Sequence, residues 1–208
     1  MIGQSWNELL FAHWPLPTEE ARRIVPEPLE PDLFEGQAFV GVVPFLMETV
    51  RFAWCPPIAG TSSFPELNVR TYVTLDGKPG VFFLSLDVGN LIALEIGRRG
   101  FGLPYFRSDV TLEAARDRVR FHARRHGHQG AFEAEYAPAG PPRVPQPGTL
   151  EHWLTERYCF YTVRSGRPWR TEVHHPPWPL QPAEASIDAP LLHFSRAQDV
   201  VAWPARSA

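Results

Sequence analysis

The sequence predicts a single domain of the mainly β (α+β) class, built on an antiparallel sheet that curls or closes into a barrel. Residues 64–75, FPELNVRTYVTL, alternate polar and apolar side chains, as a half-buried strand does. Other strand-like runs are separated by short turn signals, and only a few short stretches have a helical pattern. No repeat or long linker divides the 208 residues, so we expect one domain over 1–208.

Composition narrows the classes of partner. The chain is 44% hydrophobic and 12% aromatic, as globular proteins are. Its net charge of −3 gives no electrostatic reason to expect nucleic acid or an anionic membrane surface as a partner. No apolar run approaches the ~18 residues of a membrane span. The first residues lack a basic leader, and Cys55 and Cys159 lack a CxxC spacing, so we expect reduced cysteines and a cytoplasmic protein.

The first third of the chain contains one clear helix and one clear strand. Residues 6–14, WNELLFAHW, fit either an amphipathic helix or a strand. Residues 17–25 predict a helix with Thr18 as its cap, because Glu19 and Glu20 favour its first turn and Pro26 stops it. Residues 36–52 are apolar on both faces at first, which predicts a central strand, and residues 55–65 predict a loop.

The rest of the chain predicts two further short helices among strands. Residues 90–100 predict a helix with Asn90 as cap and Gly100 as terminator. The remaining expectations are strands over 105–136, a loop over 138–148, a helix over 149–157 capped by Thr149, a hairpin over 158–175 turning at Ser165 and Gly166, and a last strand over 191–203.

The alternating stretch forms one arm of a predicted hairpin. Pro79 has no backbone N–H for a ladder, so we place it in a four-residue loop, Gly77 to Gly80. The resulting register sets Arg70 opposite Asp87, and it separates a polar face from an apolar one. The polar face carries Glu66, Asn68, Arg70, Tyr72 and Thr74. The apolar face carries Leu67, Val69, Val73, Leu75, Phe82, Leu84, Leu86 and Val88.

Two interpretations of the polar face remain open. A solvated sheet surface would hold a cross-strand ion pair between Arg70 and Asp87, worth roughly 0–1 kcal/mol. An enclosed site would combine aromatic walls with a few convergent polar groups. Tyr72 and Phe83 among the polar side chains favour the second interpretation.

Several motifs in order resemble one family. They are FPELNVRTYV, GKPGVFFLSLD, GTLEHWLTERYCFY and EVHHPPWPLQPAEA, preceded by LLFAHWPLP and FEGQAFVGVVPF. Together, from about Trp6 to about Ala185, they resemble the YqjF-like family, domain of unknown function 2071. The resemblance implies a fold similar to acetoacetate decarboxylase, an antiparallel cone-like β-barrel around a small-molecule pocket, here with about three short helices. It carries over no activity, but it favours the enclosed site and implies that Glu156, Arg157 and Tyr158 lie near it.

One departure from that fold family bears on mechanism. Acetoacetate decarboxylase needs a desolvated lysine that forms a Schiff base with its substrate. The only lysine of this chain, Lys78, lies in the predicted hairpin turn, where its ammonium is solvated. The sequence therefore predicts that any chemistry proceeds without a Schiff-base lysine.

Three histidines are candidate functional residues. His13 is a candidate general base, since imidazole titrates near neutral pH, although a histidine between aromatic residues is more often a packing residue. His174 and His175 are adjacent on a strand and point to opposite faces, so they do not form a metal site, and one of them is expected to rim the pocket. We expect no metal and no cofactor.

Three hypotheses of function follow. The first is a lyase-like enzyme acting on a small oxo- or carboxylic acid, with Arg70 holding the carboxylate and Glu66 as acid or base. Asn68, Tyr72, Asp87, His13, Glu156 and His174 are the expected ligand-binding residues. The second is a non-catalytic protein that binds a small metabolite with the same residues. The third is a structural or assembly protein without a ligand, and exposed strand edges leave a homo-oligomer open in each case.

Overall fold

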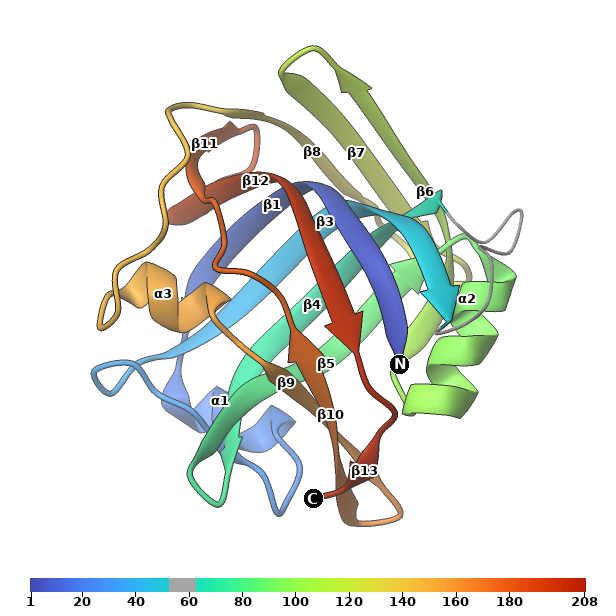
Figure 1. Ribbon diagram of the computed structural model, residues 1–208, viewed down its shortest axis with the longest axis vertical. Helices are drawn as coiled ribbons and strands as arrows, with labels where there is room; N and C mark the ends of the chain where they lie inside the picture. Colours follow the sequence, from blue (N-terminus) through green and yellow to red (C-terminus); the bar gives the residue numbers. More distant parts are fainter. Residues whose placement is uncertain (53–62) are drawn as a thin grey trace.

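The sheet closes into a ring in the computed structural model, which describes residues 1–52 and 63–208 (Figure 1). The strands are β1 (Ile2–Leu16), β2 (Glu30–Pro31), β3 (Ala38–Phe52), β4 (Ser63–Leu75), β5 (Lys78–Val88), β6 (Tyr105–Ala115), β7 (Arg118–Arg125), β8 (Phe132–Pro138), β9 (Cys159–Arg164), β10 (Arg167–His174), β11 (Gln181–Ala185), β12 (Leu191–Ala202) and β13 (Arg206–Ser207). The helices are α1 (Thr18–Ile24), α2 (Leu91–Ile96) and α3 (Leu150–Thr155), with a π-helical turn, η1 (Gly97–Phe101), directly after α2.

The order of strands around the ring is β5, β4, β3, β1, β12, β10, β9 and back to β5. Because this ring has an odd number of strands, its directions cannot alternate throughout, and one neighbouring pair must be parallel. That pair is β5 with β9, where Val81 lies opposite Phe160. The predicted mainly β, antiparallel fold is confirmed, with β5–β6 as a second parallel pairing.

A second layer covers part of the outside of the ring. β6, β7, β8 and β11 lead from β5 to β12, and the hairpin of β6 and β7 extends beyond the ring at the top of Figure 1. Along β1, Leu9 and Phe11 pack in the interior cluster, whereas Leu10 and Ala12 pack outward against the β7–β8 side. Both faces of β1 are therefore buried. This explains why polar and apolar side chains do not alternate along residues 6–14, and why the pattern there fits a helix as well as a strand.

Most predicted elements are confirmed, including the caps of α2 and α3. The Asn90 side chain accepts hydrogen bonds from the backbone N–H groups of Ile92 and Ala93. Thr149 accepts one from the N–H of His152. The strand over 36–52, the hairpin turning at Ser165 and Gly166 and the last strand also form.

Three details of the prediction were wrong. Pro17, not Thr18, is the N-cap residue of α1, and it makes no side-chain capping hydrogen bond. The second helix continues through η1 and ends at Gly102, which has the left-handed φ of 66° that glycine accommodates, rather than at Gly100. Of the loop predicted over 55–65, residues 63–65 begin β4, and the others lie outside the described residues.

The register of the opening hairpin was also wrong. The turn is the two-residue Asp76–Gly77, with φ of 51° and 75°, and Pro79 lies within β5 opposite Thr74. Such a turn takes positive φ at both residues, which Asp-Gly supplies. An irregularity between Val69 and Arg70 then sets Arg70 opposite Phe83, and Asp87 lies opposite Leu67.

Strands β7 and β8 place basic side chains opposite acidic ones. His122 lies opposite Glu133, and Arg120 lies opposite Glu135. Glu135 accepts hydrogen bonds from Arg118 at 2.6 Å and from Arg120 at 2.9 Å. One carboxylate of β8 thus binds two of the arginines of β7.

Helices close the two ends of the ring. Leu154 of α3 packs with Phe39, Tyr72 and Val81 at one end, and α2 with η1 lies at the other, beside the N-terminus in Figure 1. Among the described residues no helix is both long and apolar enough to span a membrane. The interior between the two ends holds the cavity described next.

Candidate functional site

The polar face of β4 lies inside the ring. Glu66, Asn68, Arg70 and Tyr72 follow at every second residue, so their side chains share one face, about 7 Å apart along the strand. All four are buried, and Arg70 exposes only 7% of its surface. The polar face is therefore enclosed rather than solvated, and Arg70 does not form the ion pair with Asp87 that a solvated face was expected to carry, because Asp87 binds Arg125. Leu86 and Val88, predicted for the opposite face, share this one, because the actual register sets them opposite Asn68 and Glu66.

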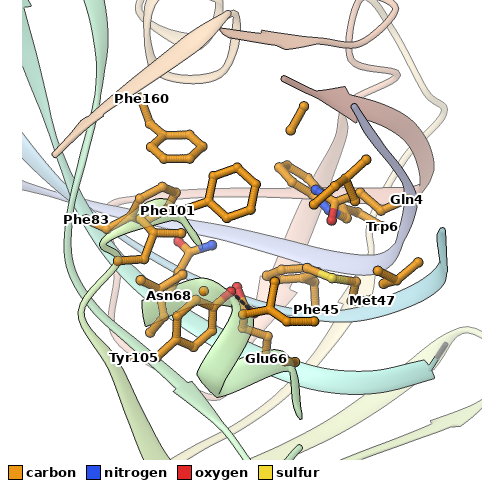
Figure 2. A pocket seen from close by; sticks show the side chains of 18 of the residues that line it. Gln4, Trp6, Phe45, Met47, Glu66, Asn68, Phe83, Phe101, Tyr105 and Phe160 are labelled. Atoms are coloured by element: carbon orange, nitrogen blue, oxygen red, sulfur yellow. Dashed lines mark hydrogen bonds between the residues drawn. The ribbon is translucent and has the colours of Figure 1, made fainter. Parts of the chain in front are cut away.

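A cavity of about 140 Å³ lies against this face (Figure 2). β1, β3, β4, β5 and the α2–η1 segment supply most of its walls. The lining residues are mainly apolar or aromatic: Ile2, Gln4, Trp6, Phe45, Met47, Val50, Phe64, Glu66, Asn68, Arg70, Phe83, Leu86, Ala93, Ile96, Gly97, Phe101, Leu103, Tyr105, Phe160, Val173 and Ala202. Apolar walls with a few polar groups are the usual composition of a small-molecule site.

Glu66 is a buried carboxyl with a single hydrogen-bond donor among the described residues. The Tyr105 hydroxyl donates to Glu66 Oε2 at 2.8 Å, the contact drawn in Figure 2. Burial raises the pKa of Glu66 from 4.5 to about 7, the hydrogen bond from Tyr105 opposes that rise, and the charge of Asp87 adds to it. A carboxyl with a pKa near 7 can both give and take a proton at neutral pH.

The π-helical turn packs closely against the ring of Tyr105. A Cβ on Gly97 would lie 2.2 Å from Cε2 of the Tyr105 ring, so only glycine lets the helix approach the ring this closely. Burial and the neighbouring Glu66 raise the pKa of Tyr105 well above its usual value, which keeps its hydroxyl a hydrogen-bond donor. The turn also places Phe101 in the cavity wall. π-Helical turns occur frequently at functional sites.

Arg70 is a buried cation that has no counter-charge among the described residues. No hydrogen bond or ion pair joins it to any residue in the described part of the chain, and its Nε is buried without a partner. Its guanidinium carbon lies 5.3 Å from the centre of the Phe11 ring and 5.8 Å from that of Tyr72. Ring faces attract a cation only modestly, so the cost of burying this charge is only partly offset. The Oδ1 of the neighbouring Asn68 also has no partner among the described residues.

His13 and Tyr72 form a layer behind Arg70. His13 Nε2 lies 2.7 Å from the Tyr72 hydroxyl oxygen. Burial, together with the charges of Arg70 and His193, lowers the pKa of His13 well below its usual value, so the ring is neutral. A Cβ on Gly41 would lie 2.9 Å from the His13 ring, so glycine makes room for it. Neither His13 nor Tyr72 lines the cavity; the Tyr72 ring contacts the Arg70 guanidinium, and His13 contacts the Tyr72 hydroxyl.

The structure does not bring the other expected residues to the cavity. Asp87 faces outward and binds Arg125, at 2.8 and 2.6 Å, and Ser108. Glu156 accepts hydrogen bonds from the Trp178 N–H and the Tyr158 hydroxyl. His174 is exposed.

His175 and Lys78 also lie outside the cavity lining. His175 is the buried member of the histidine pair, and it stacks on Tyr158 with ring centres 4.7 Å apart. Lys78 binds Glu172 at 2.9 Å, and 42% of its side chain is exposed. In the described part of the chain, no three His, Cys, Asp or Glu side chains gather into a metal site.

Several wall residues were missed in the sequence. Tyr105 reaches Glu66 only because β6 pairs in parallel with β5, a long-range pairing that no local pattern announces. Trp6 lies in the stretch that fitted helix or strand equally. Phe101 was assigned to neither helix nor site, because η1 extends past the expected end at Gly100.

Comparisons with known proteins show a family and a fold. The model of DUF2071, a family described as an uncharacterized conserved protein, matches residues 3–201. The uncharacterized protein YqjF of Bacillus subtilis (strain 168) is 40% identical over 222 residues, which cover 99% of this chain and 92% of that protein.

Solved structures with a similar fold have much lower identity. Acetoacetate decarboxylase from Legionella pneumophila is similar with a TM-score of 0.67 and 11% identity, over 100% of this chain and 88% of that one. An acetoacetate decarboxylase-like enzyme from Sphingomonas wittichii RW1 has a TM-score of 0.67 and 13% identity, over 100% and 92%. The enduracididine biosynthesis enzyme MppR, complexed with pyruvate, has a TM-score of 0.60 and 14% identity, over 98% and 90%. At these identities the likeness is one of fold alone.

Proposed function

The chain belongs to DUF2071, a family of uncharacterized conserved proteins, and we propose that its interior cavity binds a small oxo- or carboxylic acid on which Glu66 moves a proton. Arg70 binds the carboxylate of this acid, and Asn68 orients it. The reaction is lyase-like or an enolisation, and it uses no Schiff base.

The observation that carries this proposal is the unpaired charge of Arg70. A buried ionised group is normally paired, because burying it alone costs several kcal/mol. Arg70 is 7% exposed and has no anionic partner among the described residues. A ligand carboxylate supplies the missing partner, and a guanidinium binds it with two parallel charge-assisted hydrogen bonds.

Glu66 supports the proton-transfer half of the proposal. It lies four residues from Arg70 on the same face, and Asn68 lies between them. An acid held by its carboxylate at Arg70 therefore extends along Asn68 towards Glu66. A carboxyl with a pKa of about 7 is suited to remove a proton next to a carbonyl, or to protonate the resulting carbanion, at neutral pH.

The names of proteins with a similar fold agree with this class of ligand. One is a decarboxylase of acetoacetate, and another is an enzyme complexed with pyruvate, and both compounds are oxo acids. Lys78, the only lysine here, is half-exposed, ion-paired and absent from the cavity lining. The proposal therefore assigns the chemistry to acid–base catalysis by Glu66 rather than to a lysine imine.

A thermal-shift screen against short oxo acids, hydroxy acids and fatty acids tests the binding. A ligand at ~100 times its dissociation constant stabilises by about 2.7 kcal/mol, which raises Tm by roughly 5–10 °C for a domain of this size. We expect a shift with an acid, no shift with Arg70→Gln, and an unchanged shift with Arg167→Gln, whose arginine is exposed. A screen in which no acid shifts the wild type would contradict the proposal.

Proton exchange tests the chemistry separately. With an oxo acid found by the screen, NMR in heavy water measures the loss of the proton next to the carbonyl. We expect exchange catalysed by the wild type and slowed about 10²- to 10⁴-fold in Glu66→Gln, the usual contribution of a general base. Binding of the acid without proton exchange or other turnover would show that the protein binds the acid but does not catalyse a reaction on it.

A further inference from the structure

The cavity contains a single cation among its lining residues. Arg70 is the only arginine, lysine or histidine among the described residues that line it, and Glu66 is the only carboxylate. Other cations near the ring are engaged elsewhere: Arg125 with Asp87, and Arg157 with Asp32. Once a carboxylate binds Arg70, a second carboxylate in this cavity would have no cation and would be buried unpaired beside Glu66.

The two walls of the cavity are apolar. Figure 2 shows three phenylalanines gathered on one side, and an indole, a further phenyl ring and a thioether on the other. The first side is Phe83, Phe101 and Phe160, and the second is Trp6, Phe45 and Met47. Phe83 and Phe160 contact edge to face, with ring centres 5.5 Å apart. Such walls favour an apolar body between them.

The volume of the cavity limits the size of that body. It measures about 140 Å³, close to the ~150 Å³ of an apolar cavity that admits benzene. The space between the walls therefore suits one branched alkyl group or one ring as the apolar body.

From the single cation, the apolar walls and this volume, we infer that the ligand is a monocarboxylic oxo acid with a branched-alkyl or single-ring body, and not a dicarboxylic acid. The inference rests on the proposed function, because it assumes that Arg70 binds a carboxylate. In addition, the wall of Phe83, Phe101 and Phe160 favours ligands with an apolar body over ligands with a second charge.

Calorimetric titration of the full chain with three probes tests the inference. The probes are 4-methyl-2-oxopentanoate, pyruvate and 2-oxoglutarate, which share the oxo-acid end. 4-Methyl-2-oxopentanoate and 2-oxoglutarate are of nearly equal size, but the body of the former is apolar and that of the latter is charged. We expect 4-methyl-2-oxopentanoate to bind at least about tenfold tighter than pyruvate, because a single methylene in an apolar pocket discriminates by that much. We expect 2-oxoglutarate to bind more weakly than pyruvate.

A matched pair of variants locates the selectivity. Phe101 and Phe132 are both half-buried, but only Phe101 lines the cavity. Phe101→Ala is expected to lower the affinity for 4-methyl-2-oxopentanoate more than that for pyruvate, and Phe132→Ala is expected to change neither.

The outcomes separate this inference from the proposed function. If pyruvate or 2-oxoglutarate binds as tightly as 4-methyl-2-oxopentanoate, and Arg70→Gln abolishes that binding, the ligand class is overturned while the carboxylate site stands. If none of the acids binds the wild type, the proposed function fails and the inference fails with it. The comparison of probes uses the wild type alone, so it holds even if a variant does not fold.

Discussion

Glu66 and Arg70 lie on one face of β4, but they differ in charge and in their hydrogen-bond partners. Glu66 has a hydrogen-bond donor and a raised pKa, whereas Arg70 carries a charge that no described residue pairs. Burial of either group lowers the stability of the folded protein. Strained or unpaired polar groups of this kind concentrate at functional sites, where a ligand rather than the protein completes them.

The raised pKa of Glu66 predicts a pH dependence of stability. The folded state binds this proton more tightly than the unfolded state, with a pKa of about 7 against 4.5. The contribution of this group to the free energy of unfolding is therefore greatest below pH 4.5. It falls by on the order of 3 kcal/mol as the pH rises to about 7. We expect Glu66→Gln to be more stable than the wild type at pH 8, with the difference shrinking towards pH 5.

Urea unfolding of both proteins between pH 5 and 8 measures this difference. Glu184→Gln is the control, because Glu184 is exposed. A difference between Glu66→Gln and the wild type that stays constant with pH would show that Glu66 is not a neutral carboxyl in the folded protein.

The environment of Lys78 predicts that no imine forms. Its ammonium is half-exposed and bound to Glu172, so it is not desolvated as an imine-forming lysine must be. Treatment with an oxo acid and borohydride is expected to leave the mass of the protein unchanged. A mass increase that disappears in Lys78→Arg would contradict an acid–base mechanism.

At the scale of elements, the π-helical turn η1 packs against the ring of Tyr105. Gly97 and Gly100 both lie in this turn, but a Cβ would meet the Tyr105 ring only at Gly97, and nothing lies within 4 Å of one at Gly100. Gly97→Ala is expected to cost about 1–3 kcal/mol, as overpacking does, although alanine favours helices over glycine.

Gly100→Ala is the matched variant, expected to be neutral or slightly stabilising. Guanidinium unfolding of the two variants measures both effects. Equal effects at the two positions would show that the contact between Gly97 and Tyr105 does not hold the ring in place.

The sequence predicted strands and caps better than registers. Alternation along β4 identified Glu66, Asn68 and Arg70 as one face, because a period of two is visible locally. The pairing of Arg70 with Asp87 was wrong, because Asp76–Gly77 makes a two-residue turn and Pro79 enters the strand. Tyr105 could not be predicted at all, since it reaches Glu66 through a parallel pairing between distant segments.

At the scale of the molecule, closure of the ring makes the interior site. The parallel pairing of β5 with β9 joins the two ends of the ring, and the hairpin of β9 and β10 joins β12 in turn. Each wall of the cavity thus comes from a different part of the chain, so the cavity exists only when the whole ring is formed.

We therefore expect the chain to unfold as one cooperative domain. In differential scanning calorimetry a single transition should appear, with the calorimetric enthalpy equal to the van't Hoff enthalpy. The acid found by the thermal-shift screen should raise the temperature of that one transition. Two separable transitions, of which only one responds to the ligand, would contradict a single domain over 1–208.

The stability of Arg70→Met, with and without ligand, tests the central claim most directly. If Arg70 serves a ligand, replacing this unpaired charge with an apolar side chain leaves the unliganded protein as stable as the wild type or up to about 3 kcal/mol more stable. The same change abolishes stabilisation by the acid. A destabilised Arg70→Met, together with a wild type that no acid stabilises, would show that Arg70 is a structural residue and that the cavity does not bind a carboxylate.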